Sequence, residues 1–367
     1  MAARTVKALQ VNREGYPYSQ ARQLVEAALR AEVSVLLRGH PGVGKSSLAR
    51  DVADSLGLPM IDIRLAQRDP AELAGVCFPD HERNVLRQFP PEWVREACDR
   101  PMLVFLDEIN AAVTRLHQAA AYQIVLERRV GTFCFHPETR VMAAGNLEED
   151  NSIVASLSSA LCNRFAHVVL RVDVRDWLDW AASAGIDEVI QGYLARHGEE
   201  ALYENNGDMA FPTPRSWAMA SRLYRACDET LRKRAVSSCV GIGAAEKLFS
   251  YLRIYRQVHP ERIILKGEIP DFTQGRKSEP SFLSAAVFAV AAWLSNGPRI
   301  PDGVQVPDGA LPNVVRFLAA PGVDPEYAFL FLRQVRQKGR LYERLKALPE
   351  FRKLASDLMS LRTELYG

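Results

Sequence analysis

Short apolar runs alternate with helical stretches over the first half of the chain. Five runs have the length and composition of buried strands, at residues 34–38, 60–64, 102–106, 140–144 and 166–171. Residues 46–56 and 111–128 lie between them and have helical patterns. Strands that alternate with helices predict an α/β fold, in which a parallel sheet is covered by helices on its faces.

The strand pattern ends after residue 171. Helices are predicted at residues 177–184, 186–197, 214–232, 244–258 and 282–294, and again from about 313 to 366. The longest apolar run, residues 285–294, is much shorter than the roughly 20 residues of a membrane span. We therefore expect a buried helix there and no membrane span.

Composition narrows the class of protein. The chain has 367 residues, of which 48% are apolar and 25% charged, and a net charge of +2, which does not favour a strongly basic nucleic-acid binder. The first ten residues lack the apolar stretch of a signal peptide. The six cysteines form no CxxC pair, so we expect reduced thiols and a cytoplasmic location.

A glycine-rich loop follows the first predicted strand and opens a helix. It reads Gly39-His40-Pro41-Gly42-Val43-Gly44-Lys45-Ser46 and fits the phosphate-binding pattern GxxxxGK[ST]. The glycines let backbone N–H groups wrap a phosphate, Lys45 would reach the β- and γ-phosphates, and the Ser46 hydroxyl would bind Mg²⁺. With Ser47 these residues form the predicted nucleotide-binding loop.

Two carboxylates end the apolar run at 102–106. Asp107 and Glu108 would be delivered to the sheet edge where ligands bind in open α/β sheets. Asp107 is placed to hold Mg²⁺, and Glu108 to polarise the attacking water. An acidic pair at a strand end is common, but the upstream loop favours this functional interpretation.

These features together resemble the AAA+ family of ATPases. The stretch 141–146 is similar to the family's fourth strand, with Asn146 as its polar sensor 1. The stretch 160–165 resembles the segment that carries the arginine finger, here Arg164, and 211–217 resembles sensor 2, here Arg215. The resemblance implies an ATP hydrolase with Mg²⁺ and strand order 5-1-4-3-2. It also implies a core at 1–172, a helical lid at 173–275 and a helical C-terminal extension at 276–367.

Within AAA+ proteins the chain is most similar to the MoxR family. Residues 69–94 resemble the insert in helix 2 of that branch, and 129–140 its hairpin before sensor 1. Phe133 and Phe135 on this hairpin could grip a substrate in a pore or pack against the insert. The resemblance implies a homo-oligomeric ring of six subunits that remodels, activates or inserts a cofactor into a protein client, with a von Willebrand A domain partner.

Two other functions stay open. One is a nucleotide-gated binding platform that hydrolyses slowly, and the other is a DNA-directed motor related to McrB. A preference for ATP over GTP rests on the family alone. Eight basic residues between 333 and 353 could contact nucleic acid or an acidic partner, but a solvated helix face is the more common explanation. A nucleic-acid partner is therefore not expected.

Overall fold

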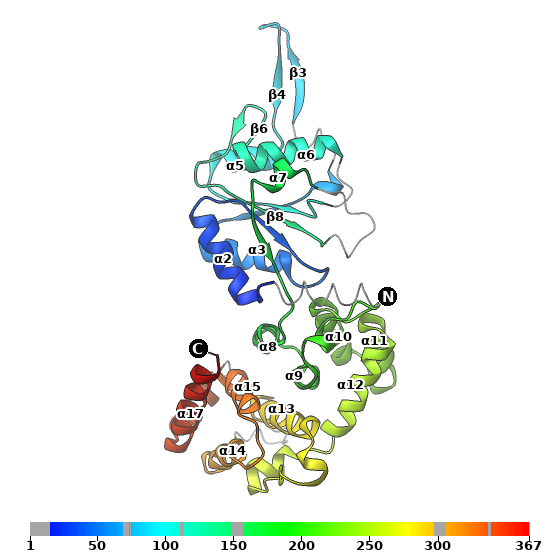
Figure 1. Cartoon of the computed structure of the whole chain (residues 1–367), viewed down its shortest axis with the longest axis vertical. Helices are drawn as coiled ribbons and strands as arrows, with labels where there is room; N and C mark the ends of the chain where they lie inside the picture. Colours follow the sequence, from blue (N-terminus) through cyan, green and yellow to red (C-terminus); the bar gives the residue numbers. More distant parts are fainter. Residues whose placement is uncertain are drawn as a thin grey trace. The chain divides into compact units, whose positions relative to one another are not determined.

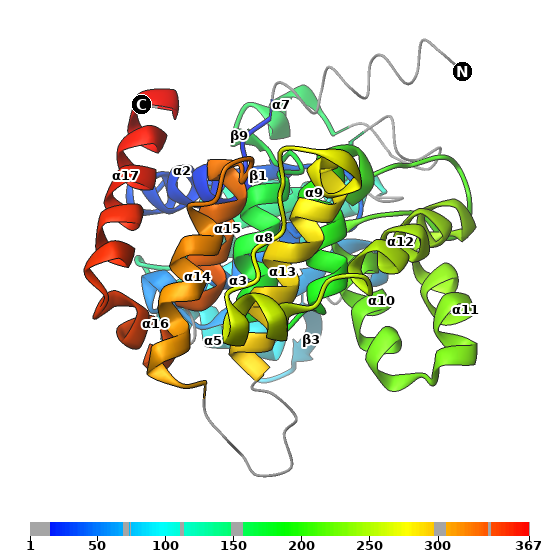
Figure 2. The ribbon, with the colours of Figure 1, turned by 90° about the horizontal axis from the view of Figure 1, so that it is seen from below.

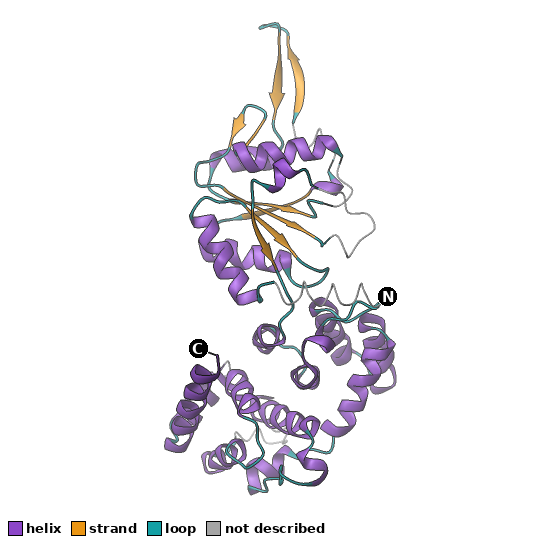
Figure 3. Ribbon diagram, in the orientation of Figure 1, coloured by secondary structure: helices purple, strands orange, loops and turns teal. Residues whose placement is uncertain are grey.

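The computed structural model describes residues 15–68, 73, 75–110, 114–147, 157–296, 306–336 and 339–366. The chain divides after Asp173 into two compact units. The first is an α/β unit and the second is built of helices (Figure 3). None of the helices in the described part of the chain combines the length and the apolar composition of a membrane span.

A five-stranded parallel sheet forms the centre of the first unit. Its strands are β1 (Val35–Arg38), β2 (Met60–Arg64), β5 (Leu103–Asp107), β8 (Arg140–Gly145) and β9 (Ala166–Val169). Their spatial order is β2-β5-β8-β1-β9, with all neighbours parallel (Figure 1). Counted along the chain this order is 2-3-4-1-5, which confirms the predicted order and α/β fold class.

Helices cover both faces of this sheet. The helices of the unit are α2 (Tyr18–Arg30), α3 (Lys45–Leu56), α5 (Glu92–Asp99), α6 (Arg115–Tyr122) and α7 (Ser159–Cys162), with short helical turns η1 (Leu65–Gln67) and η2 (Gln123–Glu127). Helices α2 and α3 lie on one face, and α5 and α6 lie on the other (Figure 1). Every residue of β5 is buried, as expected for a strand with both faces covered.

Only part of the helix predicted at 111–128 is an α-helix. Residues 111–113 lie outside the described residues, and α6 begins after Thr114, whose side chain accepts a hydrogen bond from the His117 N–H. The chain then continues as the π-helical turn η2 and ends at Arg128, which has a left-handed backbone.

Two hairpins extend the α/β unit. The first consists of β3 (Val76–Asp80) and β4 (Val85–Phe89) and lies in the segment expected to hold the insert, of which residues 69–72 and 74 are outside the described residues. The second consists of β6 (Arg129–Val130) and β7 (Phe133–Cys134) and lies in the segment 129–140.

Phe135 follows the second hairpin and belongs to the core. Its ring meets the ring of Trp93 edge to face at 6.0 Å between centroids. Its side chain is only 6% exposed, so packing, rather than a grip on substrate, accounts for this phenylalanine. Phe133 is partly buried against the same core.

The second unit contains ten α-helices among its described residues. They are α8 (Val174–Ser183), α9 (Glu188–Leu202), α10 (Pro214–Ala226), α11 (Glu229–Val240), α12 (Ile242–Tyr255), α13 (Pro280–Asn296), α14 (Leu311–Leu318), α15 (Pro325–Arg336), α16 (Gly339–Lys346) and α17 (Pro349–Tyr366). Shorter turns are η4 (Arg262–Lys266), η5 (Gly275–Ser278) and η6 (Asp308–Ala310). The further division of this unit near residue 275 stays a prediction.

The single helix predicted at 214–232 is wrong, because the structure has two helices there. Helix α10 ends at Ala226, and Asp228 then accepts hydrogen bonds from the N–H groups of Thr230 and Leu231 as the N-cap of α11. A side-chain carboxylate in this position satisfies N–H groups that the start of a helix leaves unpaired. The cap therefore starts a new helix instead of prolonging α10.

Helix α13 runs through the middle of the helical unit (Figure 2). Its residues from Ala285 to Ala291 are buried, which confirms the predicted buried helix. Ser284 at its start donates a hydrogen bond to the Gly192 carbonyl of α9 at 2.8 Å and shares another with the Tyr251 hydroxyl of α12 at 3.2 Å. Three helices therefore meet at this point.

The close approach at Gly192 gives a stability test. A Cβ atom there would lie 2.4 Å from the buried Tyr251 hydroxyl oxygen. Gly192→Ala should therefore lower the free energy of unfolding by about 1–3 kcal/mol, the usual cost of overpacking a core. Gly243→Ala on α12 is the control, because no atom lies within 4 Å of its added methyl group. Denaturant titration should find the control neutral or slightly stabilised; equal effects of both changes would contradict this account.

Candidate functional site

The glycine-rich loop leads from β1 into the start of α3. Gly42 and Gly44 have φ angles of +77° and +104°, a backbone region that glycine enters without steric cost. Gly44 is the N-cap of α3, so the first N–H groups of that helix lack carbonyl partners within it. Such N–H groups, at the positive end of the helix dipole, form a ready site for phosphate.

Lys45 joins this loop to the tip of β8. Its ammonium nitrogen donates to the carbonyl oxygens of Gly39 at 2.7 Å and His40 at 2.9 Å, and to the side-chain oxygen of Asn146 at 2.8 Å. The structure thus brings together two predicted residues that are far apart in the sequence. It also places the cation beside the helix N-terminus that would hold the phosphates.

Ser46, which follows Lys45 in the chain, connects the loop to Asp107 at the end of β5. The Ser46 hydroxyl donates to a carboxylate oxygen of Asp107 at 3.0 Å, and Asp107 is only 7% exposed. A hydroxyl and a carboxylate are the oxygen ligands that Mg²⁺ prefers, so the pair fits that ion. Burial, and then the charge of Asp107, raise the pKa of Asp62 on the neighbouring strand β2.

Glu108 occupies the turn directly after β5. Its φ angle is +53°, and its N–H donates to the Asp107 carboxylate at 2.9 Å. A left-handed backbone costs a residue with a side chain about 1–2 kcal/mol, so the surrounding contacts must hold this turn in place. The side chain is half-buried at the same sheet edge as the glycine-rich loop.

Arg164 lies near the amino-terminal ends of the strands, whereas the glycine-rich loop follows a carboxyl-terminal end. Arg164 precedes β9, whose first residue Ala166 pairs with Val35, the first residue of β1. The glycine-rich loop follows the other end of β1, which is four residues long, or about 10–13 Å. The exposed Arg164 side chain donates to the Tyr122 hydroxyl at 3.3 Å, so it is not part of the cluster around Lys45.

The remaining predicted residues belong to the glycine-rich loop and the start of α3, except Arg215. His40 and Val43 are buried in the loop, Pro41 is half-buried, and Ser47 is exposed in the first turn of α3. Arg215 belongs to the helical unit, where it is exposed in the first turn of α10. Its role at a nucleotide stays a prediction.

The structure adds two contacts that the motifs did not indicate. Tyr18 lies beside Gly44, since a Cβ atom on that glycine would be 3.5 Å from its ring, and its hydroxyl donates to Asp51 of α3 at 2.7 Å. Burial, and then this hydrogen bond, raise the pKa of Tyr18. Asn110 is buried and bonds the backbone of Asn146. An asparagine just after an acidic strand end was the only sequence signal for it.

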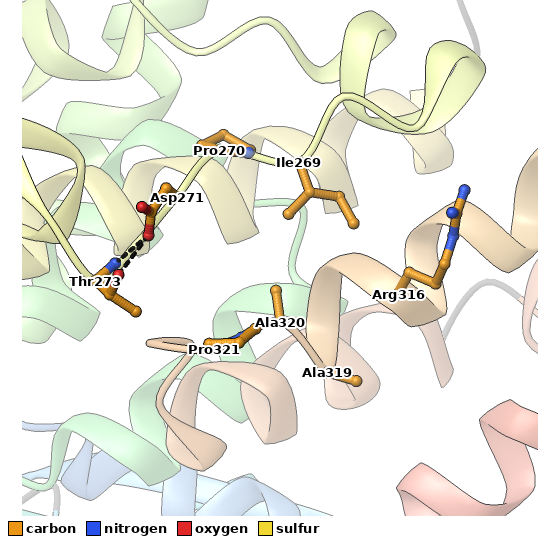
Figure 4. A pocket seen from close by; sticks show the side chains of 8 residues that line it. All are labelled: Ile269, Pro270, Asp271, Thr273, Arg316, Ala319, Ala320 and Pro321. Atoms are coloured by element: carbon orange, nitrogen blue, oxygen red, sulfur yellow. Dashed lines mark hydrogen bonds between the residues drawn. The ribbon is translucent and has the colours of Figure 1, made fainter.

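A separate surface cavity of about 560 Å³ lies in the helical unit (Figure 4). It is lined by Ile269, Pro270, Asp271, Thr273, Arg316, Ala319, Ala320 and Pro321. None of the predicted site residues is among them. The Asp271 carboxylate is engaged by the N–H and hydroxyl of Thr273, as the dashed lines in Figure 4 show.

Comparison with known protein families identifies the α/β unit. Residues 35–171 match the family described as ATPase family associated with various cellular activities (AAA). The match covers β1 through β9, and with them the glycine-rich loop, Asp107, Glu108 and Asn146. This part of the chain is therefore similar to the AAA ATPase domain.

Two curated relatives each match less than half of the chain. A bovine (Bos taurus) ATPase family gene 2 protein homolog B is 39% identical over 115 residues, which are 30% of this chain and 14% of the relative. Midasin of Dictyostelium discoideum is 30% identical over 166 residues, 41% of this chain and 3% of the relative. The chain thus spans a small fraction of either relative.

Solved structures resemble the chain more distantly. A RuvB mutant of Thermotoga maritima is 16% identical and has a TM-score of 0.37, over 81% of this chain and 94% of that chain. NtrX of Brucella abortus, solved in complex with ATP, is 16% identical with a TM-score of 0.39, over 82% of this chain and 68% of that chain.

The position of Lys45 predicts the effect of removing it. Lys45→Ala should abolish detectable ATP binding, because it deletes the cation that bridges the loop and Asn146. Isothermal titration with ATP and Mg²⁺ measures this directly. Lys233→Ala on α11, an exposed lysine paired with Glu246 in the other unit, is the matched control and should bind normally. ATP binding by Lys45→Ala at wild-type affinity would refute the site.

Proposed function

We propose that this protein is a MoxR-type AAA+ ATPase that hydrolyses ATP in a ring and uses the cycle to remodel, activate or insert a cofactor into a protein client. The observation that carries the proposal is a cluster of exposed apolar side chains on the β3–β4 hairpin of the unit that also holds the proposed phosphate and magnesium site. The MoxR resemblance and the insert-like position of that hairpin support the same conclusion.

Each residue of the proposed site would have a separate role in hydrolysis. Lys45 and the N-terminus of α3 would hold the phosphates, and Ser46 and Asp107 would hold Mg²⁺, which when bound neutralises phosphate charge. Glu108 would orient and activate the water, while Asn146 would report the state of the γ-phosphate through its contact with Lys45. Arg215 would contact nucleotide from the helical lid.

A ring explains the position of Arg164. This arginine lies at the sheet edge opposite its own glycine-rich loop, so it serves a phosphate only if that phosphate belongs to another subunit. Contacts of this head-to-tail kind close into a ring when the rotation permits, and six subunits is the family expectation. An arginine supplied across an interface stabilises transition-state charge by about 10³- to 10⁵-fold in rate.

This arrangement predicts complementation between two inactive variants. Arg164→Ala should bind ATP but hydrolyse almost none, and Lys45→Ala should also be inactive while keeping its arginine. Mixing the two should restore part of the ATP turnover, because some interfaces then pair an intact loop with an intact arginine. Arg95→Ala on α5, also an exposed arginine, is the control and should remain active alone.

Steady-state turnover across mixing ratios, with light scattering to measure mass, checks the prediction. Subunits must exchange before the assay, so labelled protein should first establish that exchange occurs. Full activity of Arg164→Ala by itself would contradict the role of Arg164 as an arginine finger. A mass that stays monomeric with ATP and Mg²⁺ would contradict the proposed ring.

The β3–β4 hairpin supports a protein client. The strand register places Val76, Phe78, Val85 and Phe89 on one face, and each is about half exposed. Asp80 and Arg87 lie on the same face and pair with each other at 3.7 Å, so the apolar cluster consists of Val76, Phe78 and Phe89. The Phe78 and Phe89 rings meet edge to face at 5.5 Å. Neighbouring exposed apolar side chains such as these three mark interaction sites more often than isolated ones do, and extended or unfolded protein offers matching chemistry.

Changing that face should separate client response from basal turnover. We expect reduced, carboxymethylated α-lactalbumin, a permanently unfolded protein, to stimulate wild-type ATP turnover. The double variant Phe78→Ser with Phe89→Ser should lose this stimulation and keep the basal rate, since the hairpin gives no side chain to the nucleotide site. Leu231→Ser on α11 removes a similarly exposed apolar side chain and should respond normally.

Other outcomes of the same assay favour the other functions. Slow turnover that no protein stimulates would favour a nucleotide-gated platform. Stimulation by duplex DNA, lost at high salt, would favour a DNA-directed motor. The structure gives little support to that motor, because Arg333 and Arg344 of the basic stretch already pair with Asp179 and Asp308.

A further inference from the structure

Asn110 makes two hydrogen bonds to the backbone of one other residue. Its side-chain nitrogen donates to the Asn146 carbonyl at 2.8 Å, and its side-chain oxygen accepts from the Asn146 N–H at 3.2 Å. The side chain is 9% exposed, so water competes little for these bonds. An asparagine amide can satisfy a donor and an acceptor at once, and here both face the same residue.

The backbone before Asn146 is shaped for this contact. A Cβ atom at Gly145 would lie 2.8 Å from the Asn110 side-chain oxygen and 3.0 Å from its amide carbon. Because real Cβ atoms do not come this close, a side chain at Gly145 would push the amide away. Asn110 thus supplies the hydrogen bonds, and the missing side chain at Gly145 leaves room for its amide group.

The same contact closes the turn that carries Glu108. Glu108 has the left-handed backbone described above, and the next residue, Ile109, donates its N–H to the Ala144 carbonyl at 2.9 Å. Asn110 then bonds Asn146. Residues 109 and 110 therefore attach the chain after Glu108 to the end of β8, immediately beside the amide that contacts Lys45.

We propose that Asn110 is a positioning residue, which holds the Glu108 turn and Asn146 at a constant separation. This inference rests on the proposed hydrolysis, in which Glu108 activates water and Asn146 contacts the γ-phosphate region through Lys45. Without these two hydrogen bonds, Asn146 could still contact nucleotide. The distance between its side chain and the Glu108 carboxylate would, however, no longer be constant. Misplacement by about 1 Å can lower a rate by about 10²-fold.

The first experiment compares turnover with affinity. Asn110→Ala should lower kcat by about 10- to 100-fold, while the KM and the Kd for ATP change less than about threefold. Asn110→Asp keeps the acceptor oxygen and the volume but, when ionised, has no proton to donate to the Asn146 carbonyl, so its kcat should fall in the same way. Thr139→Val is the control, because Thr139 is a fully buried hydrogen-bonding residue of the same unit bonded to Ala97 and not to the site. It should keep the wild-type kcat.

A second comparison tests the contact from its other side. Gly145→Ala should reduce kcat like Asn110→Ala, and the double variant should lose no more than the worse single variant, because both changes break one contact. Multiplicative losses would overturn the shared role. A wild-type kcat for Asn110→Ala, or a loss confined to ATP affinity, would overturn it as well.

Hydrogen exchange gives a readout that does not depend on turnover. The Asn146 N–H is bonded by Asn110, so Asn110→Ala should accelerate exchange in the peptide that covers residues 140–147, and Thr139→Val serves again as control for general loosening. Unchanged exchange would refute the positioning role. Absence of ATP turnover in the wild type would instead refute the proposed function, and the exchange result would still decide the positioning role of Asn110.

Discussion

The ammonium group of Lys45 is the contact on which the arrangement of the site depends. It bonds two carbonyls of its own loop and the side chain of Asn146, so it joins the end of β1 to the end of β8. Hydrogen bonds from a charged ammonium group are stronger than those between neutral groups, because each acceptor dipole interacts with a full charge. These three bonds therefore hold the glycine-rich loop against the end of β8.

The sheet makes this contact possible. Parallel strands place all their carboxyl ends at one edge, and the order β5-β8-β1 makes the ends that carry Asp107, Asn146 and the glycine-rich loop immediate neighbours. Helices on both faces leave the strand interiors apolar, so polar chemistry is confined to the tips. Arg164 has the opposite position because it precedes its strand instead of following it. Whether a residue follows or precedes its strand thus decides whether it lies near Lys45, as Asp107 and Asn146 do, or away from it, as Arg164 does.

The hairpins connect to this core through specific contacts. The Gln88 side-chain oxygen of β4 accepts from the Thr132 N–H of the β6–β7 turn at 3.4 Å, and a Cβ atom at Gly131 would collide with the same side chain. Trp93 of α5 then packs against Phe135. An isolated two-stranded hairpin is barely stable in water, so these contacts explain how β3–β4 can expose apolar side chains and remain paired.

Much of the architecture and part of the site could be predicted from residue types along the chain. The five strands, the glycine-rich loop and the acidic end of β5 follow from residue types that are contiguous in the chain, and the strand order came from the family that those motifs resemble. Tertiary structure alone decided the contacts between distant segments, such as Asn110 with Asn146, Tyr18 beside Gly44, and Phe135 with Trp93. The physical reason is that a side chain's local pattern indicates whether it is buried, but its partner is set by which strands and helices become neighbours.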